Sequence, residues 1–251
     1  MSTHEPATEH RRLAALRTLA LIDLTSLGEN DVPADIDVLC DGATTSFGEV
    51  AAVCVWPQFV SQAVGRLAGT DIDIAAVANF PAGDADPALA IADAKQIVAD
   101  GGTEVDVVYP WRSLALGDVD AGPRLVAATR QAIGPDVGLK VILETGELVE
   151  EQLIRTAAMH ALDAGADFLK TSTGKTARSA TPEAAAVLLD VLASYQSEAG
   201  IKISGGVRTV DQAVVYLDLA DRVMGSDWVS KETFRFGASS LLGDVLAALS
   251  T

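Results

Sequence analysis

Short apolar segments alternate with amphipathic segments along most of the chain. Eight apolar runs have the length and composition of buried β-strands: 19–24, 50–55, 72–78, 104–108, 138–143, 166–170, 201–204 and 221–224. Longer segments between them repeat apolar residues at helical spacing, most clearly at 87–99, 122–133, 147–164, 181–199 and 210–219. Two more helices are expected at 8–18 and 237–249.

The regular alternation of strands and helices predicts an α/β fold. Apolar strands that alternate with helices form parallel sheets, and eight such units favour a closed (β/α)8 TIM barrel over an open sheet. The helix at 8–18 would precede the first strand as an extra N-terminal helix. Because no low-complexity linker or change in composition interrupts the pattern, we expect a single barrel domain, residues 1–251.

Charged residues occur in several strand runs at positions that would face the inside of the barrel. Successive side chains of a strand point to opposite faces, so a charged residue between two outward-facing apolar residues points inward. Buried ions are unfavourable unless they pair, and barrel chemistry lies at the carboxyl ends of the strands. Any one lysine could instead be a strand-end residue whose amine reaches solvent. The convergence of five charged residues favours a functional site: Asp23, Asp106, Lys140, Lys170 and Lys202.

Lys170 has the surroundings expected of a nucleophile. It ends the predicted strand at 166–170, and the next five residues, Thr171 to Lys175, are small, hydroxylic or basic. A desolvated, neutral lysine attacks carbonyl groups, but an ordinary lysine with a pKa of about 10.4 is rarely neutral at pH 7. A second cation about 5 Å away, such as Lys202, would disfavour protonated Lys170 by roughly 3 kcal/mol. Asp106 with Lys202 could then serve as an acid/base unit.

Small-residue segments at the carboxyl ends of the last three predicted strands suit a phosphate group. Glycine lets backbone amides approach an anion, and the first amides of a helix attract negative charge. Each glycine pair alone is more typical of a tight turn, and Arg208 is equally compatible with a helix cap. Together the segments predict a substrate-binding and phosphate-binding corner that includes Thr171, Gly174, Lys175, Gly205, Gly206, Gly237, Ser239 and Ser240.

The overall charge of the protein limits the classes of partner. The formal net charge is −17 at pH 7, and no nucleic-acid partner is expected, because nucleic-acid binders concentrate positive charge. Four of the six lysines nevertheless lie in segments assigned to one end of the barrel. An acidic shell would focus electrostatic potential on this basic centre, although chance placement on an acidic surface is an alternative explanation.

The sequence contains no motif for a metal or a nucleotide cofactor. Its three histidines form no HxH or HExxH pattern, and there is no GxGxxG or P-loop sequence, so we expect no metal and no cofactor. Cys40 and Cys54 lie in apolar stretches without CxxC spacing, and no apolar segment is long enough for export or membrane insertion. These features predict a cytoplasmic protein without a membrane partner.

Seven sequence blocks resemble the deoxyribose-phosphate aldolases, a family of class I aldolases. These enzymes interconvert deoxyribose 5-phosphate with acetaldehyde and glyceraldehyde 3-phosphate through a lysine Schiff base. The blocks occur in the order of the family and span nearly the whole chain: LIDLTSL at 21–27, VAAVCVWPQF at 50–59, EVDVVYP at 104–110, LKVILETGEL at 139–148, AGADFLKTSTGK at 164–175, KISGGVRT at 202–209 and RFGASSLL at 235–242.

The resemblance implies a role for each charged residue of the predicted site. Lys170 matches the Schiff-base lysine of the family, Lys202 the lysine that perturbs it, and Asp106 the proton-relay acid. Asp23 and Lys140 match the polar network around these three. The resemblance also implies a sugar phosphate and an aldehyde as the small-molecule partners, a homo-oligomer (dimer or tetramer), and a part in deoxyribonucleotide catabolism.

Two further features of the sequence qualify this resemblance. Cys54 matches a cysteine that lines the family's site without a chemical role. Some members carry a C-terminal tyrosine that folds over the site, whereas this chain reads Ala-Ala-Leu-Ser-Thr at 247–251. We therefore expect proton transfer to depend on Asp106, Lys202 and water.

Two other functions remain as alternatives. Another Schiff-base sugar-phosphate aldolase would keep Lys170 and the phosphate loops, whereas a non-catalytic barrel that binds a phosphorylated metabolite would keep only the loops. The intact set of Asp106, Lys170 and Lys202 argues against a non-catalytic barrel. The block-by-block match argues against a different aldolase.

Overall fold

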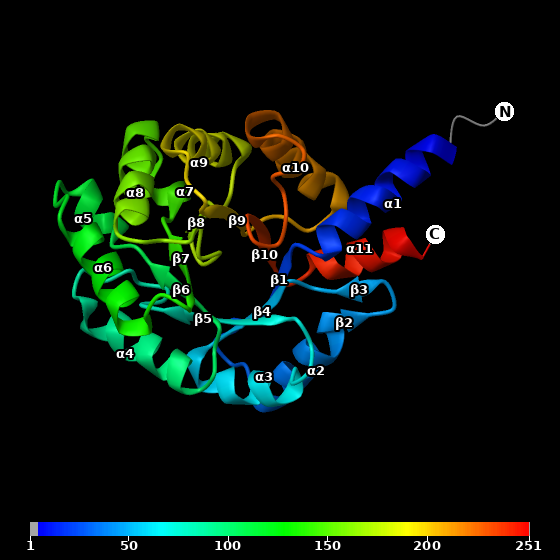
Figure 1. Ribbon diagram of the computed structural model, residues 1–251, viewed down its shortest axis with the longest axis horizontal. Helices are drawn as coiled ribbons and strands as arrows, with labels where there is room; N and C mark the ends of the chain where they lie inside the picture. The colour runs from blue at the N-terminus through cyan, green and yellow to red at the C-terminus, as the bar shows by residue number, and fades with distance from the viewer. Residues whose placement is uncertain (1–4, 251) are drawn as a thin grey trace.

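The computed structural model describes residues 5–250, and a closed barrel of eight parallel strands lies at its centre (Figure 1). The first strand, β1 (Ile22–Thr25), pairs with both the second barrel strand and the last one, which closes the sheet. The other barrel strands are β4 (Ala52–Val55), β5 (Asp73–Ala78), β6 (Glu104–Val108), β7 (Gly138–Ile142), β8 (Phe168–Lys170), β9 (Gly200–Ser204) and β10 (Phe234–Ala238). The predicted α/β TIM barrel is confirmed.

Helices connect the strands and surround the barrel (Figure 1). The short strands β2 (Thr44–Thr45) and β3 (Gly48–Glu49) form a separate two-stranded sheet. The helices are α1 (Glu5–Leu19), α2 (Pro33–Ala43), the 3₁₀ helix η1 (Pro57–Phe59), α3 (Val60–Arg66), α4 (Pro87–Ala99), α5 (Trp111–Ala115), α6 (Ala121–Ile133), α7 (Thr145–Leu148), α8 (Glu151–Asp163), α9 (Pro182–Tyr195), α10 (Val210–Met224) and α11 (Leu241–Leu249). No helix within residues 5–250 has both the length and the apolar character needed to cross a membrane.

Capping residues determine where several outer helices begin and end. The side chains of Asp86 and Thr181 accept hydrogen bonds from first-turn amides of α4 and α9, and a proline follows each of them. Thr209 and Gln212 form a capping box at the start of α10, and Gly225, with a φ of 96°, ends that helix. These local signals therefore support the alternation that the apolar pattern predicts.

The main hydrophobic core lies between the strands and the ring of helices. Outward-facing strand residues such as Val105 and Val107 are fully buried in one cluster with helix residues such as Ile97 and Leu125. Full burial of an aliphatic side chain of this size stabilises a fold by roughly 1.5–3 kcal/mol. The outward faces of the strands thus hold the barrel to its helices, which leaves the inward faces free for polar groups.

The predicted N-terminal helix is present as α1, which packs beside α10 and α11 at the edge of the barrel (Figure 1). Two of its three arginines form ion pairs with these two helices. Arg11 lies 2.9 Å from Asp244 of α11, and Arg17 lies 2.5 Å from Asp221 of α10. The first and last helices therefore contact each other although they are far apart in the sequence.

The predicted eighth strand at 221–224 is wrong. These residues form the last turn of α10, because no helix-breaking residue occurs before Gly225. The true eighth strand, β10, reads Phe-Arg-Phe-Gly-Ala and lacks a continuous apolar run, since Arg235 and Gly237 occupy its inward-facing positions. The hydrophobic pattern therefore did not reveal β10, because one of its inward-facing residues is charged.

Several predicted helix boundaries also differ from the structure, most clearly in two places. The last helix begins at Leu241 and not at 237, because Gly237 and Ala238 still pair within the barrel. The predicted helix at 147–164 is divided into α7 and α8 around Val149, whose φ of 55° is incompatible with a continuous helix. The number and order of the barrel units are unaffected by these differences.

Candidate active site

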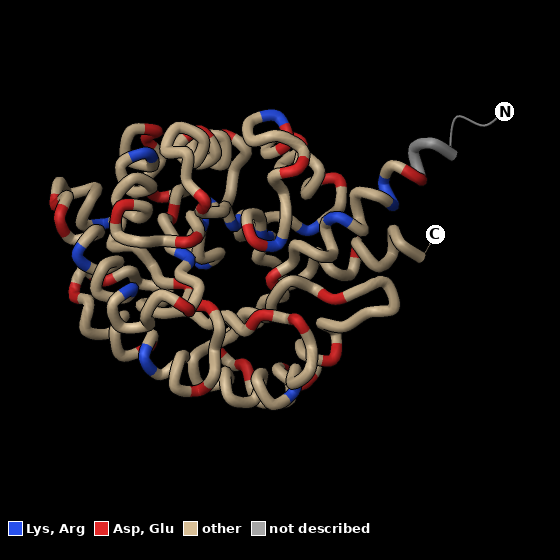
Figure 2. Tube along the Cα trace, viewed as in Figure 1, with Lys and Arg blue, Asp and Glu red and all other residues tan. Residues whose placement is uncertain are grey.

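The five charged residues predicted to face the barrel interior lie there, and their side chains are buried. Figure 2 shows that many other Asp and Glu residues lie on the helices and loops around the barrel. Asp106 is at the centre of the group. Its Oδ2 atom accepts hydrogen bonds from Lys170 Nζ and Lys202 Nζ, each at 2.7 Å, while Lys140 Nζ lies 3.3 Å from Oδ1. Asp23 Oδ2 lies 2.5 Å from Lys202 Nζ. The Asp106 carboxylate therefore contacts three amines, and the Asp23 carboxylate forms a further ion pair with Lys202.

Two other buried charged residues of the barrel interior, Glu104 and Arg235, were not predicted from the sequence. Arg235 lies 2.8 Å from Asp23, 3.2 Å from Glu104 and 3.1 Å from Asp73, and Glu104 also pairs with Lys140. A signal for Glu104 was present, because it lies two residues before Asp106 and so shares its strand face. Arg235 was missed because the eighth strand had been placed elsewhere.

These eight ionisable residues form what we call the charge column, which runs through the barrel from the start of β5 to the end of β8. Its charges alternate in sign along the chain of contacts described above. Its carboxylates come from β1, β5 and β6, and its amines and guanidinium group from β7 to β10. The members are Asp23, Asp73, Glu104, Asp106, Lys140, Lys170, Lys202 and Arg235.

Gly237 makes room for part of this column. A Cβ atom at this position would lie 3.0 Å from Cε of Lys202 and 2.3 Å from the Ser204 hydroxyl. Glycine at 237 therefore allows the Lys202 side chain to extend along the inside of β10 toward Asp106. This steric role explains its position in a strand, where glycine is otherwise unfavourable.

The surroundings of Lys170 lower its pKa from the usual value. Burial is the largest cause and the charge of Lys202 adds to it, whereas Asp106 opposes both. Burial also disfavours the charged forms of Lys202 and Asp106, but their ion pairs outweigh it. The pKa of Lys202 is raised well above its usual value, and that of Asp106 is well below. At neutral pH Asp106 and Lys202 are thus ionised, and Lys170 is the amine that most readily loses its proton.

An apolar wall adjoins the charge column. It contains Leu27, Cys54, Ala75 and Val77, with the partly buried Trp56 and Phe80 packed against them. Cys54 Sγ lies 3.8 Å from Asp106 Oδ2, so the two surfaces meet at this residue. Burial raises the pKa of the Cys54 thiol, which favours its protonated form.

A cavity of about 830 Å³ lies over the carboxyl ends of β1, β8, β9 and β10. Lys170 is the only member of the charge column among the residues that line it. Thr171 and Cys54, both predicted to bind substrate, do not line it. The Thr171 hydroxyl instead bonds to the backbone of Ser204. The other predicted binding residues do line the cavity: Gly174, Lys175, Gly205, Gly206, Gly237, Ser239 and Ser240.

Hydrogen bonds hold the loop after β8 over this cavity. Glu144, which follows β7, accepts bonds from the Thr173 hydroxyl at 2.5 Å and the Thr173 amide at 3.2 Å. Lys175 Nζ donates to the carbonyl oxygen of Leu27 at 2.7 Å and so spans the cavity toward β1. Ser240 lies at the N-terminus of α11, where free amides and the helix dipole favour an anion.

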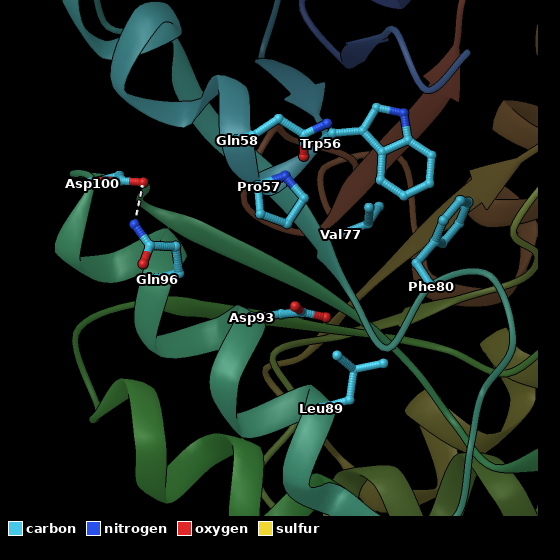
Figure 3. A pocket seen from close by; sticks show the side chains of 9 residues that line it. All are labelled: Trp56, Pro57, Gln58, Val77, Phe80, Leu89, Asp93, Gln96 and Asp100. Atoms are coloured by element: carbon cyan, nitrogen blue, oxygen red, sulfur yellow. Dashed lines mark hydrogen bonds between the residues drawn. The ribbon is translucent and has the colours of Figure 1, made fainter. Parts of the chain in front are cut away.

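A second cavity, of about 570 Å³, lies beside the barrel between η1, the end of β5 and α4 (Figure 3). Trp56 and Phe80 border it, and their rings meet edge to face with centroids 5.4 Å apart. This pair also packs on the apolar wall, and Val77 of that wall lines the cavity as well, so the second cavity adjoins the wall. Nothing in the sequence pattern had predicted this cavity.

Metal ligands were expected to be absent. Among the residues from 5 to 250, the structure groups no three His, Cys, Asp or Glu side chains in an arrangement suited to a metal ion. The independence of the activity from metal remains a prediction.

The fold and the site together define a class of protein: a (β/α)8-barrel enzyme with a buried lysine at the floor of an anion-suited cavity. A family model described as DeoC/LacD family aldolase matches residues 17–244. The chain therefore belongs to this aldolase family.

Individual relatives agree with this assignment. The chain is 48% identical to a deoxyribose-phosphate aldolase of Agrobacterium fabrum (strain C58 / ATCC 33970), over 95% of this chain and 92% of the relative. It is also similar to two solved structures described as deoxyribose-phosphate aldolases. The apo form from Toxoplasma gondii ME49 has a TM-score of 0.88 at 27% identity, covering 96% of this chain and 98% of that one. The structure from Coccidioides immitis has a TM-score of 0.81 at 28% identity, covering 96% of both chains.

Proposed function

We propose that the protein is a class I aldolase that reversibly cleaves 2-deoxy-D-ribose 5-phosphate to D-glyceraldehyde 3-phosphate and acetaldehyde. One observation carries this proposal. Among the charge column residues, Lys170 alone reaches the cavity, and it is also the amine whose pKa is lowered. The relative with 48% identity is named for the same substrate.

The phosphate group would bind at the corner where the loops after β8 and β9 meet the N-terminus of α11. Lys175 and Arg208 supply positive charge there, and Ser239 and Ser240 supply hydroxyl and amide donors. Gly206, with a φ of 89°, leaves its amide open to an anion without a Cβ atom nearby. An anion bound at this corner would place the sugar chain across the cavity toward Lys170.

The first chemical step is the attack of neutral Lys170 on the aldehyde carbon of the open-chain sugar. The resulting carbinolamine loses its hydroxyl group as water after protonation, which leaves a protonated imine. Asp106 bonds to both Lys170 and Lys202 and is therefore placed to pass the required proton between the two amines. The buried Lys202 ammonium is the proton donor in this arrangement.

The protonated imine then serves as the electron sink for carbon–carbon bond cleavage. Removal of the proton from the C3 hydroxyl breaks the bond between C2 and C3, and glyceraldehyde 3-phosphate leaves. The electron pair of that bond moves into an enamine on Lys170. Protonation of the enamine carbon and addition of water release acetaldehyde, and both steps return protons through Asp106, Lys202 and water.

Borohydride reduction in the presence of acetaldehyde tests the proposal. One reduced two-carbon adduct is expected, and peptide mapping should place it on Lys170. Lys170→Met should abolish the adduct, whereas Lys175→Met, at an exposed amine of the same loop, should retain it. An adduct on Lys202 or Lys140 would contradict the assignment. Absence of any adduct would favour a non-catalytic barrel.

Several broader properties belong to the same proposal. We propose that residues 1–251 form one domain, that no cofactor takes part, and that the enzyme acts in cytoplasmic deoxyribonucleotide catabolism. The free cysteines Cys40 and Cys54 support a reducing compartment. We also propose a homo-oligomer. The structure titled as a tetrameric deoxyribose phosphate aldolase from Aeropyrum pernix shares this fold at 23% identity, so size measurements must determine the number of subunits.

A further inference from the structure

We infer that Arg235 and Glu104 are positioning residues that balance the charge inside the barrel, so that its interior is neutral when Lys170 carries no proton. This inference rests on the proposed function, because it explains how the Schiff-base lysine is kept reactive. The residues that carry it lie at the opposite end of the barrel interior from the substrate cavity and do not line that cavity.

A count of the buried charges within the charge column supports this inference. Asp73 is set aside because one third of its side chain is exposed, and the other members of the column are all at least about nine-tenths buried. Without a proton on Lys170, three cations balance three carboxylates: Lys140, Lys202 and Arg235 against Asp23, Glu104 and Asp106. Protonation of Lys170 adds one uncompensated positive charge, which is unfavourable in a buried site.

The contacts of Arg235 connect this balance to the catalytic end. Arg235 binds Asp23 Oδ1 at 2.8 Å, and the other oxygen of Asp23 lies 2.5 Å from Lys202. Lys202 in turn shares Asp106 Oδ2 with Lys170. Two carboxylates and one amine thus link the guanidinium group to the nucleophile.

Glu104 forms a parallel link on the other side of the column. It binds Arg235 at 3.2 Å and pairs with Lys140, whose amine lies 3.3 Å from Asp106 Oδ1. The ring of Phe168 is stacked near both cations, 5.7 Å from the Arg235 guanidinium and 5.8 Å from Lys140 Nζ. Both links are therefore fixed by packing as well as by charge.

Each barrel strand except β8, which carries Lys170 itself, contributes a titratable group to the surroundings of Lys170. Apart from the residue replaced, these groups are unchanged in the variants of Arg235 and Glu104, so the shifts of the two variants can be compared directly. The facing groups are Asp23 of β1, Cys54 of β4, Asp73 of β5, Glu104 and Asp106 of β6, Lys140 of β7, Lys202 of β9 and Arg235 of β10, with Glu144 and Lys175 in the loops above.

The inference predicts changes of opposite sign for two single variants. Arg235→Met leaves the interior with an excess negative charge, which stabilises protonated Lys170 and moves its titration to higher pH. Glu104→Gln leaves an excess positive charge and moves the titration to lower pH. At about 10 Å and an effective dielectric constant of about 20, each change corresponds to roughly one pH unit. The double variant restores the balance, so its titration should return to that of the unmodified protein.

The experiment measures the rate at which acetic anhydride acetylates Lys170 as a function of pH, by mass spectrometry of the Lys170 peptide. This reaction requires a neutral amine but no aldolase turnover, so it separates this inference from the proposed function. Asp71→Asn, which removes an exposed carboxylate near the start of β5, is the matched control and should cause no shift. Circular dichroism verifies the fold of each variant.

The results that support or overturn the inference are distinct. Opposite shifts in the single variants, with their cancellation in the double variant, support it. Shifts of the same sign, no shift, or a double variant that keeps the shift of one parent overturn it. If one single variant does not fold, the other single variant and the double variant still decide, since the shift of that single variant should be lost in the double variant. Failure of the borohydride adduct with intact opposite shifts would reject only the proposed function.

Discussion

Replacement of Lys202 by leucine is expected to slow imine formation by about 100-fold at neutral pH. Lys170 and Lys202 each place Nζ 2.7 Å from the same oxygen of Asp106, so the two amines are no farther apart than the sum of these distances. Two unit charges about 5 Å apart at an effective dielectric constant of about 20 repel each other by roughly 3 kcal/mol, or about two pKa units.

The sign of this effect follows from the form of Lys170 that the cation disfavours. Burial lowers the pKa of Lys170, and the charge of Lys202 lowers it further. Without Lys202 the pKa rises, so the neutral fraction of Lys170 falls about 100-fold at any pH below the pKa. The loss should diminish as the pH rises, because Lys170 then loses its proton in the variant as well.

The assay is the rate of the borohydride-trapped acetaldehyde adduct on Lys170 between about pH 6 and about pH 10, together with kcat/KM for deoxyribose 5-phosphate. Lys202→Arg keeps a positive charge and is the matched control, with a smaller expected loss of trapping rate. A loss of equal size at every pH would refute the electrostatic reasoning. An unchanged trapping rate would show that burial alone keeps Lys170 neutral.

Three further predictions concern the phosphate corner, metals and the end of the chain. Ser239→Asp should raise KM for deoxyribose 5-phosphate through repulsion at the start of α11, while adduct formation with acetaldehyde persists. If adduct formation and activity on deoxyribose 5-phosphate fall to the same extent, Ser239 has a structural role. Prolonged treatment with a chelator should leave turnover unchanged, and a loss that zinc restores would contradict this. Deletion of Ser250 and of Thr251, which lies outside the described residues, should keep kcat within a few-fold, because the Ser250 side chain is exposed and donates a hydrogen bond to the Leu246 carbonyl of its own helix. A loss of about 100-fold or more would instead assign the tail a part in proton transfer.

Most of the barrel could be predicted from the sequence because its strands combine apolar outward-facing residues with few interruptions. The runs at 50–55 and 104–108 contain β4 and β6 at the predicted positions. The eighth strand could not be found in this way, since Arg235 and Gly237 occupy its inward face and a hydrophobic pattern does not reveal an ion-paired interior. The pattern instead assigned the strand to the apolar last turn of α10.

The alternation of side chains along strands located five of the buried charges, because the direction of a side chain in a strand depends only on its position. The same rule applied to Glu104 would have added a sixth. This rule does not predict which of the buried charged side chains contact each other, because those contacts depend on how strands that are distant in the sequence align. Thr171 is an example of this limit. It was predicted to bind substrate because its side chain is small and polar, but its hydroxyl hydrogen-bonds to the backbone of Ser204.

The carboxylates and the cations of the charge column come from different halves of the sequence, and this has a consequence for folding. The carboxylates lie on β1, β5 and β6, all before Gly134, and the cations lie on β7 to β10, all after Val137. A fragment of either half would have to bury groups of one sign that repel each other, so neither should fold alone. Fragments obtained by cutting within 134–137 would instead neutralise each other on mixing. The barrel is therefore expected to form in a single cooperative transition, without a stable half-barrel intermediate.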